Sequence, residues 1–76
     1  MNKNKRMSTL GVGERGIVAE LVCGNDMRRR FLDLGLTAGC EVECVGKSPL
    51  GDPRAYLLRG KTVAIRRTDA DNVVLI

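Results

Sequence analysis

The sequence predicts an all-β fold: a small closed or half-open barrel of about five short strands, with one short helix inserted after the first strand. Three observations support this prediction. The 76 residues suffice for one domain, the nine glycines favour many tight turns, and apolar residues alternate over several short runs. With one Phe, one Tyr and no Trp, the core must be built mainly from aliphatic side chains.

Alternating apolar residues, bounded by Gly, Pro and Asp, place the strands. The first strand is predicted over residues 16–22, with Ile17, Ala19 and Leu21 on its inner face. The remaining strands are predicted over residues 40–45, 54–59, 62–66 and 73–76. The inward positions give a predicted core of Ile17, Leu21, Phe31, Val42, Tyr56, Leu58, Val63 and Ile65. Short strands with tight connections in so short a chain favour a barrel of the SH3-like type.

One helix is predicted over residues 25–34. Asn25 is a good N-cap, and apolar residues recur behind it at i, i+4 and i+7, which places them on one face. Gly35 then stands where a left-handed residue ends a helix, and Leu36 can pack back on Phe31.

Two tighter turns are predicted further along the chain. Gly60 and Lys61 suit a two-residue hairpin turn between two of the predicted strands. Thr68 is predicted to cap a single helical turn over residues 69–71.

The positive charge is concentrated at the N-terminus. The chain has thirteen basic and nine acidic residues, a net charge of +4, and Lys3, Lys5 and Arg6 supply three of the basic charges. Residues 1–7 are therefore predicted to be a disordered basic tail, and residues 8–76 the folded domain. The domain is nearly neutral, so we expect no nucleic-acid binding, which needs a dense basic face.

The three cysteines indicate a cytoplasmic protein with free thiols. Their number is odd, and the sequence shows neither an export signal nor an apolar run of about 18 residues. Cys40 and Cys44 share the parity of Val42, so they are predicted to pack inward. Along a strand they would lie about 13 Å apart, too far for one ion or a disulfide. Cys23 lies in a turn and is predicted to be the more exposed thiol.

No catalytic constellation is present, and the chain is predicted not to be an enzyme. The sequence contains no His, which removes the commonest general base and a common metal ligand. Glu41 and Glu43 lie on one side of a predicted strand, where a solvated face is favoured over an acid–base pair. No cofactor is predicted. A site for a divalent transition metal, iron or zinc, built from Cys23 and a carboxylate or shared between two chains, stays open.

A run of three arginines is the sharpest charge feature of the predicted helix. Arg28, Arg29 and Arg30 spread around the helix because successive residues turn by about 100°. Arg29 is placed to pair with Asp33 one turn later. A solvated helix face and a contact with a partner stay equally open for this run.

The loop at residues 47–53 is the most informative segment for binding. Two prolines stiffen it, and Leu50 stands at its centre. Either Leu50 is exposed for a partner, which a preformed loop favours because it loses little entropy on binding, or it folds back over the barrel end.

Residues 30–39, RFLDLGLTAG, and residues 48–53, SPLGDP, are two motifs whose order and spacing resemble those of a known family. They resemble the RLLDLGLTPG stretch and the APLGDP loop of the FeoA family. Gly60 followed by residues 63–67, VAIRR, is similar to its G…LALRR hairpin. The match covers roughly residues 8–76, so it is far more specific than any single motif.

The resemblance implies an SH3-like barrel that works beside FeoB, a membrane ferrous iron transporter with a cytoplasmic G-protein domain. We therefore expect a cytoplasmic accessory protein that docks on this transporter and modulates it. By matching motif, the expected contact residues are Leu50, Gly51, Asp52, Arg28, Arg29 and Arg30. The same fold unit occurs as the C-terminal domain of metal-dependent repressors, so a metal-binding regulatory module is the alternative. A homodimer is left open.

Overall fold

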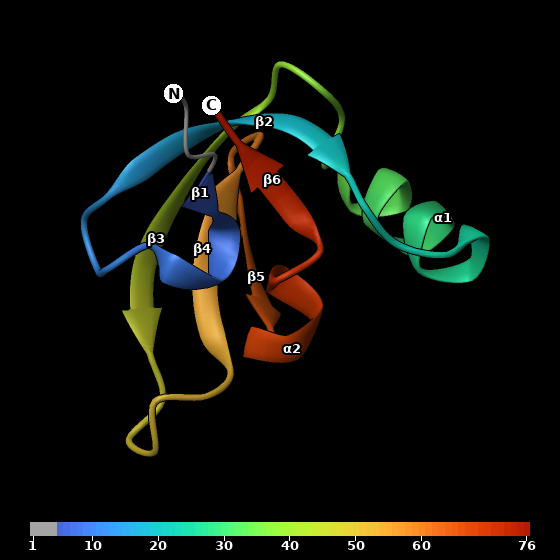
Figure 1. Ribbon diagram of the computed structural model, residues 1–76. Helices are drawn as coiled ribbons and strands as arrows, with labels where there is room; N and C mark the ends of the chain where they lie inside the picture. The colour runs from blue at the N-terminus through green and yellow to red at the C-terminus, as the bar shows by residue number, and fades with distance from the viewer. Residues whose placement is uncertain (1–4) are drawn as a thin grey trace.

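The computed structural model describes residues 5–76, which form one curved antiparallel sheet flanked by short helices (Figure 1). The strands lie in the order β1-β6-β2-β3-β4-β5. Because β1 and β5 at the two ends do not pair, the barrel is not closed. No helix in residues 5–76 has the length and apolar character needed to cross a membrane. The elements are β1 (Lys5–Arg6), the 3-10 helix η1 (Met7–Thr9), β2 (Arg15–Leu21), α1 (Asn25–Leu34), β3 (Glu41–Lys47), β4 (Arg54–Leu58), β5 (Lys61–Ile65), α2 (Arg67–Ala70) and β6 (Val73–Leu75).

The predicted all-β architecture, with a helix after the first long strand, is confirmed, but the N-terminal boundary differs. Strand β1 pairs with β6, which raises the number of strands to six, and Met7 is completely buried. The predicted tail is therefore wrong for residues 5–7, while residues 1–4, with Lys3, lie outside the described residues. The local run of basic charge does not reveal that these residues are folded. Their burial depends on α2 and β6, two elements at the C-terminal end of the chain, on which η1 packs.

A β-bulge in β2 changes the predicted inward face. The register of β2 against β6 shifts between Val18 and Glu20. An extra residue in one strand changes the parity of every residue beyond it. Val18 is therefore completely buried and Leu21 remains buried, whereas Ile17 is only half-buried. The prediction that Ile17 is a core residue is wrong for this reason.

Helix α1 has the predicted bounds, and its C-terminus follows the predicted pattern. Gly35 adopts a φ of 98°, a left-handed conformation that glycine reaches without strain. The N–H of Leu36 donates to the carbonyl of Phe31 at 2.9 Å, as in a Schellman motif. At the N-terminus the N-cap is Gly24 rather than Asn25, and no side chain caps the helix.

Arg59 fixes the end of α1 to the turn between β4 and β5. Its Nε donates to the Gly35 carbonyl at 2.9 Å, and its Nη2 donates to Thr37 Oγ1 at 2.8 Å. Arg59 and Gly60 form the two-residue turn with φ values of 48° and 79°, as a type I′ hairpin requires. The predicted turn is displaced by one residue, because Lys61 already belongs to β5.

The core lies on the predicted faces of β3 and β4. The inward packing of Cys40 and Cys44 is confirmed, with 7% and 0% of their surfaces exposed. Val63 is half-buried and packs against the same cluster. The other predicted core residues that are buried are Leu21, Phe31, Val42, Tyr56, Leu58 and Ile65.

Strand β4 also holds η1 in place. Nη1 of Arg54 donates to the carbonyls of Ser8 and Leu10 at 3.2 and 2.7 Å. The buried Tyr56 hydroxyl donates to the carbonyl of Met7 at 3.3 Å, and burial is the main reason that the pKa of Tyr56 is raised. These bonds connect the N-terminal residues to the middle of the sheet.

Candidate partner-binding surface

The loop between β3 and β4, residues 48–53, is held by its own hydrogen bonds. The N–H of Gly51 donates to the Ser48 carbonyl at 2.8 Å, and the Ser48 hydroxyl donates to the Asp52 carbonyl at 2.7 Å. The Ser48 N–H donates to the Pro53 carbonyl at 3.2 Å, which closes the base of the loop. The loop is therefore a preformed projection, the lowest part of the molecule in Figure 1.

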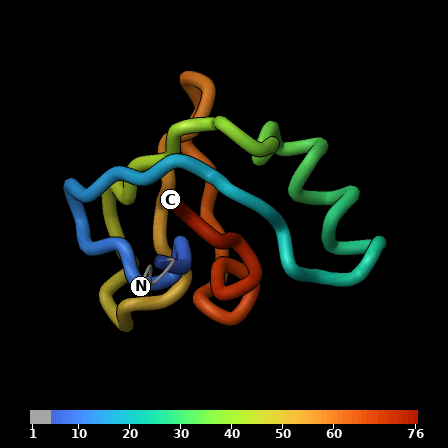
Figure 2. Tube along the Cα trace, turned by 45° about the horizontal axis from the view of Figure 1, so that its top comes forward, coloured from blue at the N-terminus to red at the C-terminus, as the bar shows by residue number. Residues whose placement is uncertain are grey.

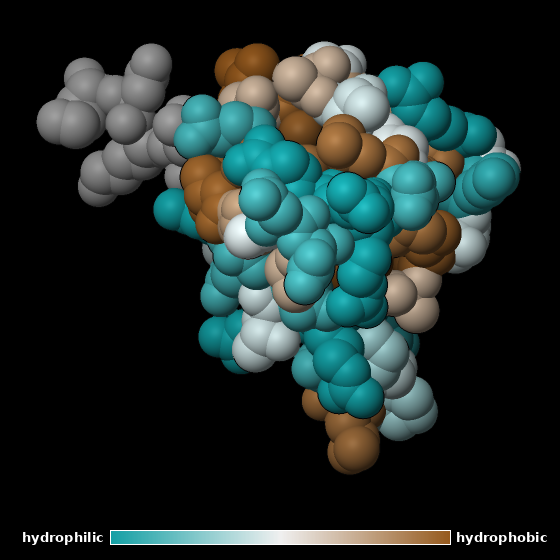
Figure 3. Space-filling view, turned by 90° about the vertical axis from the view of Figure 1, so that its right-hand side faces the viewer, coloured by the Kyte–Doolittle hydropathy of each residue, from teal (hydrophilic) through white to brown (hydrophobic). Residues whose placement is uncertain are grey.

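Leu50 lies at the tip of this loop with 94% of its surface exposed. Figure 3 shows apolar atoms at the end of the projection. Of the two alternatives that the sequence left open, the exposed tip is the one found. Removing such a side chain from water contributes about 1.5–3 kcal/mol, and the isolated chain gains none of it. We call this feature the Leu50 tip.

Asp52 has a role in the fold itself. Its Oδ1 accepts a hydrogen bond from the backbone N–H of Arg67, the first residue of α2, at 2.8 Å. The first N–H groups of a helix have no partner within the helix, so this carboxylate satisfies one of them. The prediction that Thr68 caps this turn is wrong: Arg66 occupies the N-cap position without a side-chain bond. The capping group comes instead from a loop that is distant in the sequence.

The three arginines of α1 have different environments. Nη2 of Arg28 donates to the carbonyl of Leu21 at 3.0 Å, which ties α1 to the end of β2. Arg29 and Arg30 are exposed. The predicted pair between Arg29 and Asp33 does not form. All three residues are exposed, but Arg29 and Arg30 are the two whose guanidinium groups form no hydrogen bond or ion pair within residues 5–76.

The Leu50 tip and α1 do not form one continuous surface. In Figure 1 the loop projects at the lower end, whereas α1 lies at the right-hand side, and Figure 2 shows the same separation. The structure therefore divides the expected contact residues into the Leu50 tip and an exposed arginine face on α1, formed by Arg29 and Arg30.

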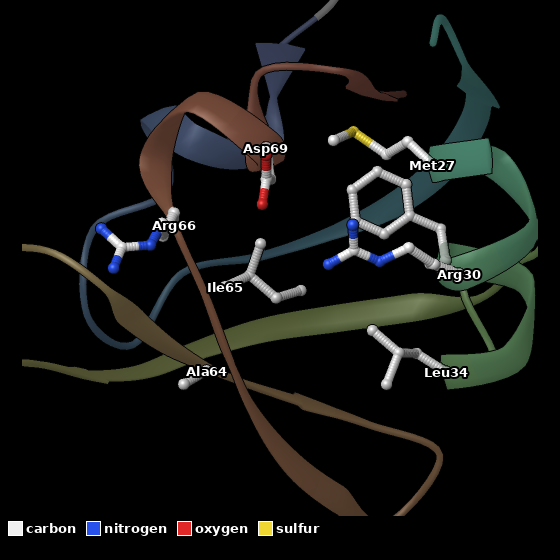
Figure 4. Close-up of a pocket in the computed structure, with 8 residues that line it drawn as sticks. Met27, Arg30, Leu34, Ala64, Ile65, Arg66 and Asp69 are labelled. Carbon is white, nitrogen blue, oxygen red and sulfur yellow. The ribbon is translucent and has the colours of Figure 1, made fainter. Parts of the chain in front are cut away.

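A groove that the sequence analysis did not identify lies between α1, β5 and α2. It has a volume of about 230 Å³. Figure 4 shows Met27, Arg30 and Leu34 on the α1 side and Ile65 on the β5 side. The apolar spacing of α1 indicates the helix face that lines this groove, but the pattern predicts that the face is fully buried. Leu34 instead keeps 38% of its surface exposed, so the spacing alone did not predict a groove. The α1–β5 groove is lined chiefly by Met27, Arg30, Phe31, Leu34, Ile65 and Asp69.

The thiols of the described chain are free and do not assemble a metal centre. Cys23 is half-buried, and Cys40 and Cys44 are buried in the core. Within residues 5–76, no three side chains of His, Cys, Asp or Glu come together in a way that could hold an ion.

The family model described as the FeoA domain matches residues 5–75. The chain belongs to the FeoA family. The match begins at β1, so the FeoA domain includes residues 5–7, which the sequence placed in a tail. Family membership links the chain to ferrous iron transport, as the resemblance implied.

Two solved structures of FeoA proteins confirm the SH3-like fold. The NMR structure of a FeoA-like protein from Clostridium acetobutylicum is 29% identical, with a TM-score of 0.89 over 100% of this chain and 88% of that chain. The crystal structure of Stenotrophomonas maltophilia FeoA complexed with zinc, an SH3 domain protein, is also 29% identical. Its TM-score is 0.82 over 95% of this chain and 89% of that chain.

A FeoA-containing relative is joined to a transporter. The Fe(2+) transport protein A/Fe(2+) transporter FeoB fusion protein of Porphyromonas gingivalis is 29% identical over 68 residues. The match covers 90% of this chain and 8% of that relative. The chain therefore corresponds to a small part of the fusion protein.

Proposed function

We propose that this chain is a non-catalytic adaptor that docks on the cytoplasmic part of a FeoB-type ferrous iron transporter and modulates transport. The fused Porphyromonas gingivalis relative supports this proposal. Fusion holds two modules at an effective concentration of about millimolar for a short flexible linker. Such an arrangement suits modules that bind each other.

The observation on which the proposal rests is the Leu50 tip, which is 94% exposed. The loop beneath it is fixed by hydrogen bonds of residues 48–53 with one another. A fixed loop loses little conformational entropy on binding, so most of the gain from burying Leu50 goes into affinity. The folded domain includes Lys5 and Arg6, so residues 5–76 carry twelve basic and nine acidic residues. The Leu50 tip itself is apolar, so specificity at the tip falls to a small desolvated contact rather than to long-range attraction.

The other expected contact residues act in this proposal in two ways. Gly51 and Asp52 position the Leu50 tip, Gly51 through its φ of 87° and Asp52 through its carbonyl, which accepts the hydrogen bond from the Ser48 hydroxyl. Arg29 and Arg30 form a separate exposed face, where positive charge raises the rate of encounter with an acidic partner more than the final affinity.

Binding of the purified cytoplasmic domain of a FeoB-type transporter tests the proposal. Leu50→Asp is expected to weaken docking by at least about 2 kcal/mol, or about 30-fold, the threshold of a binding hot spot. Its melting temperature should stay that of the wild type, because an exposed loop tip contributes little to the core. Val12→Asp is the matched control, since Val12 is an apolar side chain with 57% exposure in another turn.

The outcomes are distinct. If the wild-type chain does not bind the transporter domain, the adaptor role is wrong. If the wild-type chain binds, but Leu50→Asp and Val12→Asp each reduce the affinity only slightly and to the same extent, docking occurs through another surface. Modulation is tested separately, by ferrous iron uptake into vesicles that contain the transporter with and without the chain.

A further inference from the structure

Strand β5 is a free edge of the sheet. Among residues 5–76, β4 is the one strand that pairs with it. In a two-residue type I′ hairpin, the residues that flank the turn, here Leu58 and Lys61, are hydrogen-bonded to each other. Hydrogen-bonded and non-hydrogen-bonded pairs alternate along an antiparallel ladder. The N–H and C=O groups of Thr62 and Ala64 therefore point away from β4, toward the open edge.

These outward groups meet no other part of the described chain. Within residues 5–76, no loop or side chain is hydrogen-bonded to Thr62 or Ala64, and both residues are exposed. Their free groups repeat every second residue, about 7 Å apart. Such a row is the template to which another extended chain adds.

The free edge forms one wall of the α1–β5 groove. Ala64 and Ile65 line the groove from β5, and Met27, Phe31 and Leu34 line it from α1. An extended segment beside β5 would therefore have its backbone opposite free N–H and C=O groups. Its alternate side chains would lie against apolar surface, the arrangement that gives specificity in strand addition.

The groove is also charged and preformed. Arg30 from α1 and Asp69 from α2 line it (Figure 4), and neither side chain forms an ion pair or a hydrogen bond within residues 5–76. The hydrogen bonds of Arg59 to Gly35 and Thr37 fix the distance between α1 and the β4–β5 turn. An acidic side chain opposite Arg30 and a donor opposite Asp69 complement these walls.

We propose that the α1–β5 groove binds an extended peptide segment, which adds to β5 as a further strand. The segment presents apolar side chains to Phe31 and Leu34, and an acidic side chain to Arg30. A bound helix would leave Thr62 and Ala64 unused, because its own N–H and C=O groups are bonded internally. The segment would belong to the docking partner, so the inference rests on the proposed function for the identity of that partner, and the Leu50 tip makes a separate contact.

Selection of random displayed peptides of about ten residues, longer than a typical strand, tests the groove without the transporter. The whole chain is the bait. We expect the selected peptides to alternate apolar with other residues and to contain Asp or Glu. Synthetic copies should shift the amide NMR signals of Thr62 and Ala64.

Two variants then test the mode of binding. Ala64→Pro removes an outward N–H and keeps the ladder to β4, because a proline is tolerated where the N–H faces away from the sheet. It should weaken the selected peptides about tenfold or more. Arg30→Glu should weaken them about fivefold. Arg29→Glu makes the same change of charge outside the groove, and it should weaken peptide binding by less than about twofold.

The results separate the two proposals. Melting curves, and protection of the Val63 amide from hydrogen exchange, verify that Ala64→Pro is folded, because the Val63 amide pairs with β4. If Ala64→Pro does not fold, the comparison of peptide binding between Arg30→Glu and Arg29→Glu tests the groove instead. The inference is wrong if no peptide is selected, or if the folded groove variants bind the peptides as tightly as the wild type does. If the transporter domain binds but excess peptide does not displace it, the partner's segment lies elsewhere and the adaptor role stands. If the peptides bind and the transporter domain does not, the groove stands and the adaptor role fails.

Discussion

Replacing Asp52 by Ala is expected to destabilise the fold while leaving the side chain of the Leu50 tip in place. The change removes the acceptor of the Arg67 N–H, now at 2.8 Å from Oδ1. Loss of a capping side chain costs about 0.5–2 kcal/mol, typically about 1 kcal/mol. For a domain of this size, 1 kcal/mol corresponds to a fall of about 4–8 °C in the melting temperature. The bond from Ser48 goes to the carbonyl of Asp52, so the loop keeps its own hydrogen bonds.

Thermal unfolding followed by circular dichroism measures this effect. Asp52→Asn places an amide oxygen where the carboxylate oxygen was. Its melting temperature should fall less than that of Asp52→Ala, since Asn caps helices about as well as Asp. Leu50→Asp, two residues away, should have the melting temperature of the wild type. If Asp52→Ala also has that melting temperature, the cap contributes nothing to stability. If Asp52→Asn loses as much as Asp52→Ala, the missing acceptor is not the cause.

Three further predictions follow from burial in the described chain. Met7→Ala should lower the free energy of unfolding by about 2–5 kcal/mol in urea titrations, because Met7 is completely buried; a residue of a disordered tail would leave the midpoint unchanged. Cys23, which is half-buried, should react with a thiol reagent faster than the buried Cys40 and Cys44, and equal rates in a mass-spectrometric time course would contradict the assigned burial. The raised pKa of Tyr56 means that the unfolded chain releases the phenolic proton first as the pH rises through about 10. Stability should therefore fall above that pH more steeply in the wild type than in Tyr56→Phe, and identical pH slopes in urea unfolding would refute the assignment.

The sequence by itself determined the elements whose signals are local. Helix α1 ends as predicted because Gly35 supplies the left-handed residue and Leu36 the backward bond, both within five residues of Phe31. The inward faces of β3 and β4 follow from alternation alone. The loop at residues 48–53 was also predicted from its prolines and glycine, but the sequence left the exposure of Leu50 open, and the structure decided it. The order and spacing of such segments also identified the family.

Only the tertiary structure decided what depends on residues distant in the sequence. Met7 is a core residue because α2 and β6 cover it, the parity of β2 depends on its bulge against β6, and Asp52 caps a helix that begins at Arg67. The α1–β5 groove exists because α1 is tied to the β4–β5 turn by Arg59 and leaves the edge of β5 open. A local pattern reports the propensity of a segment, whereas burial, capping and the space between two elements are properties of pairs that the folded chain brings together.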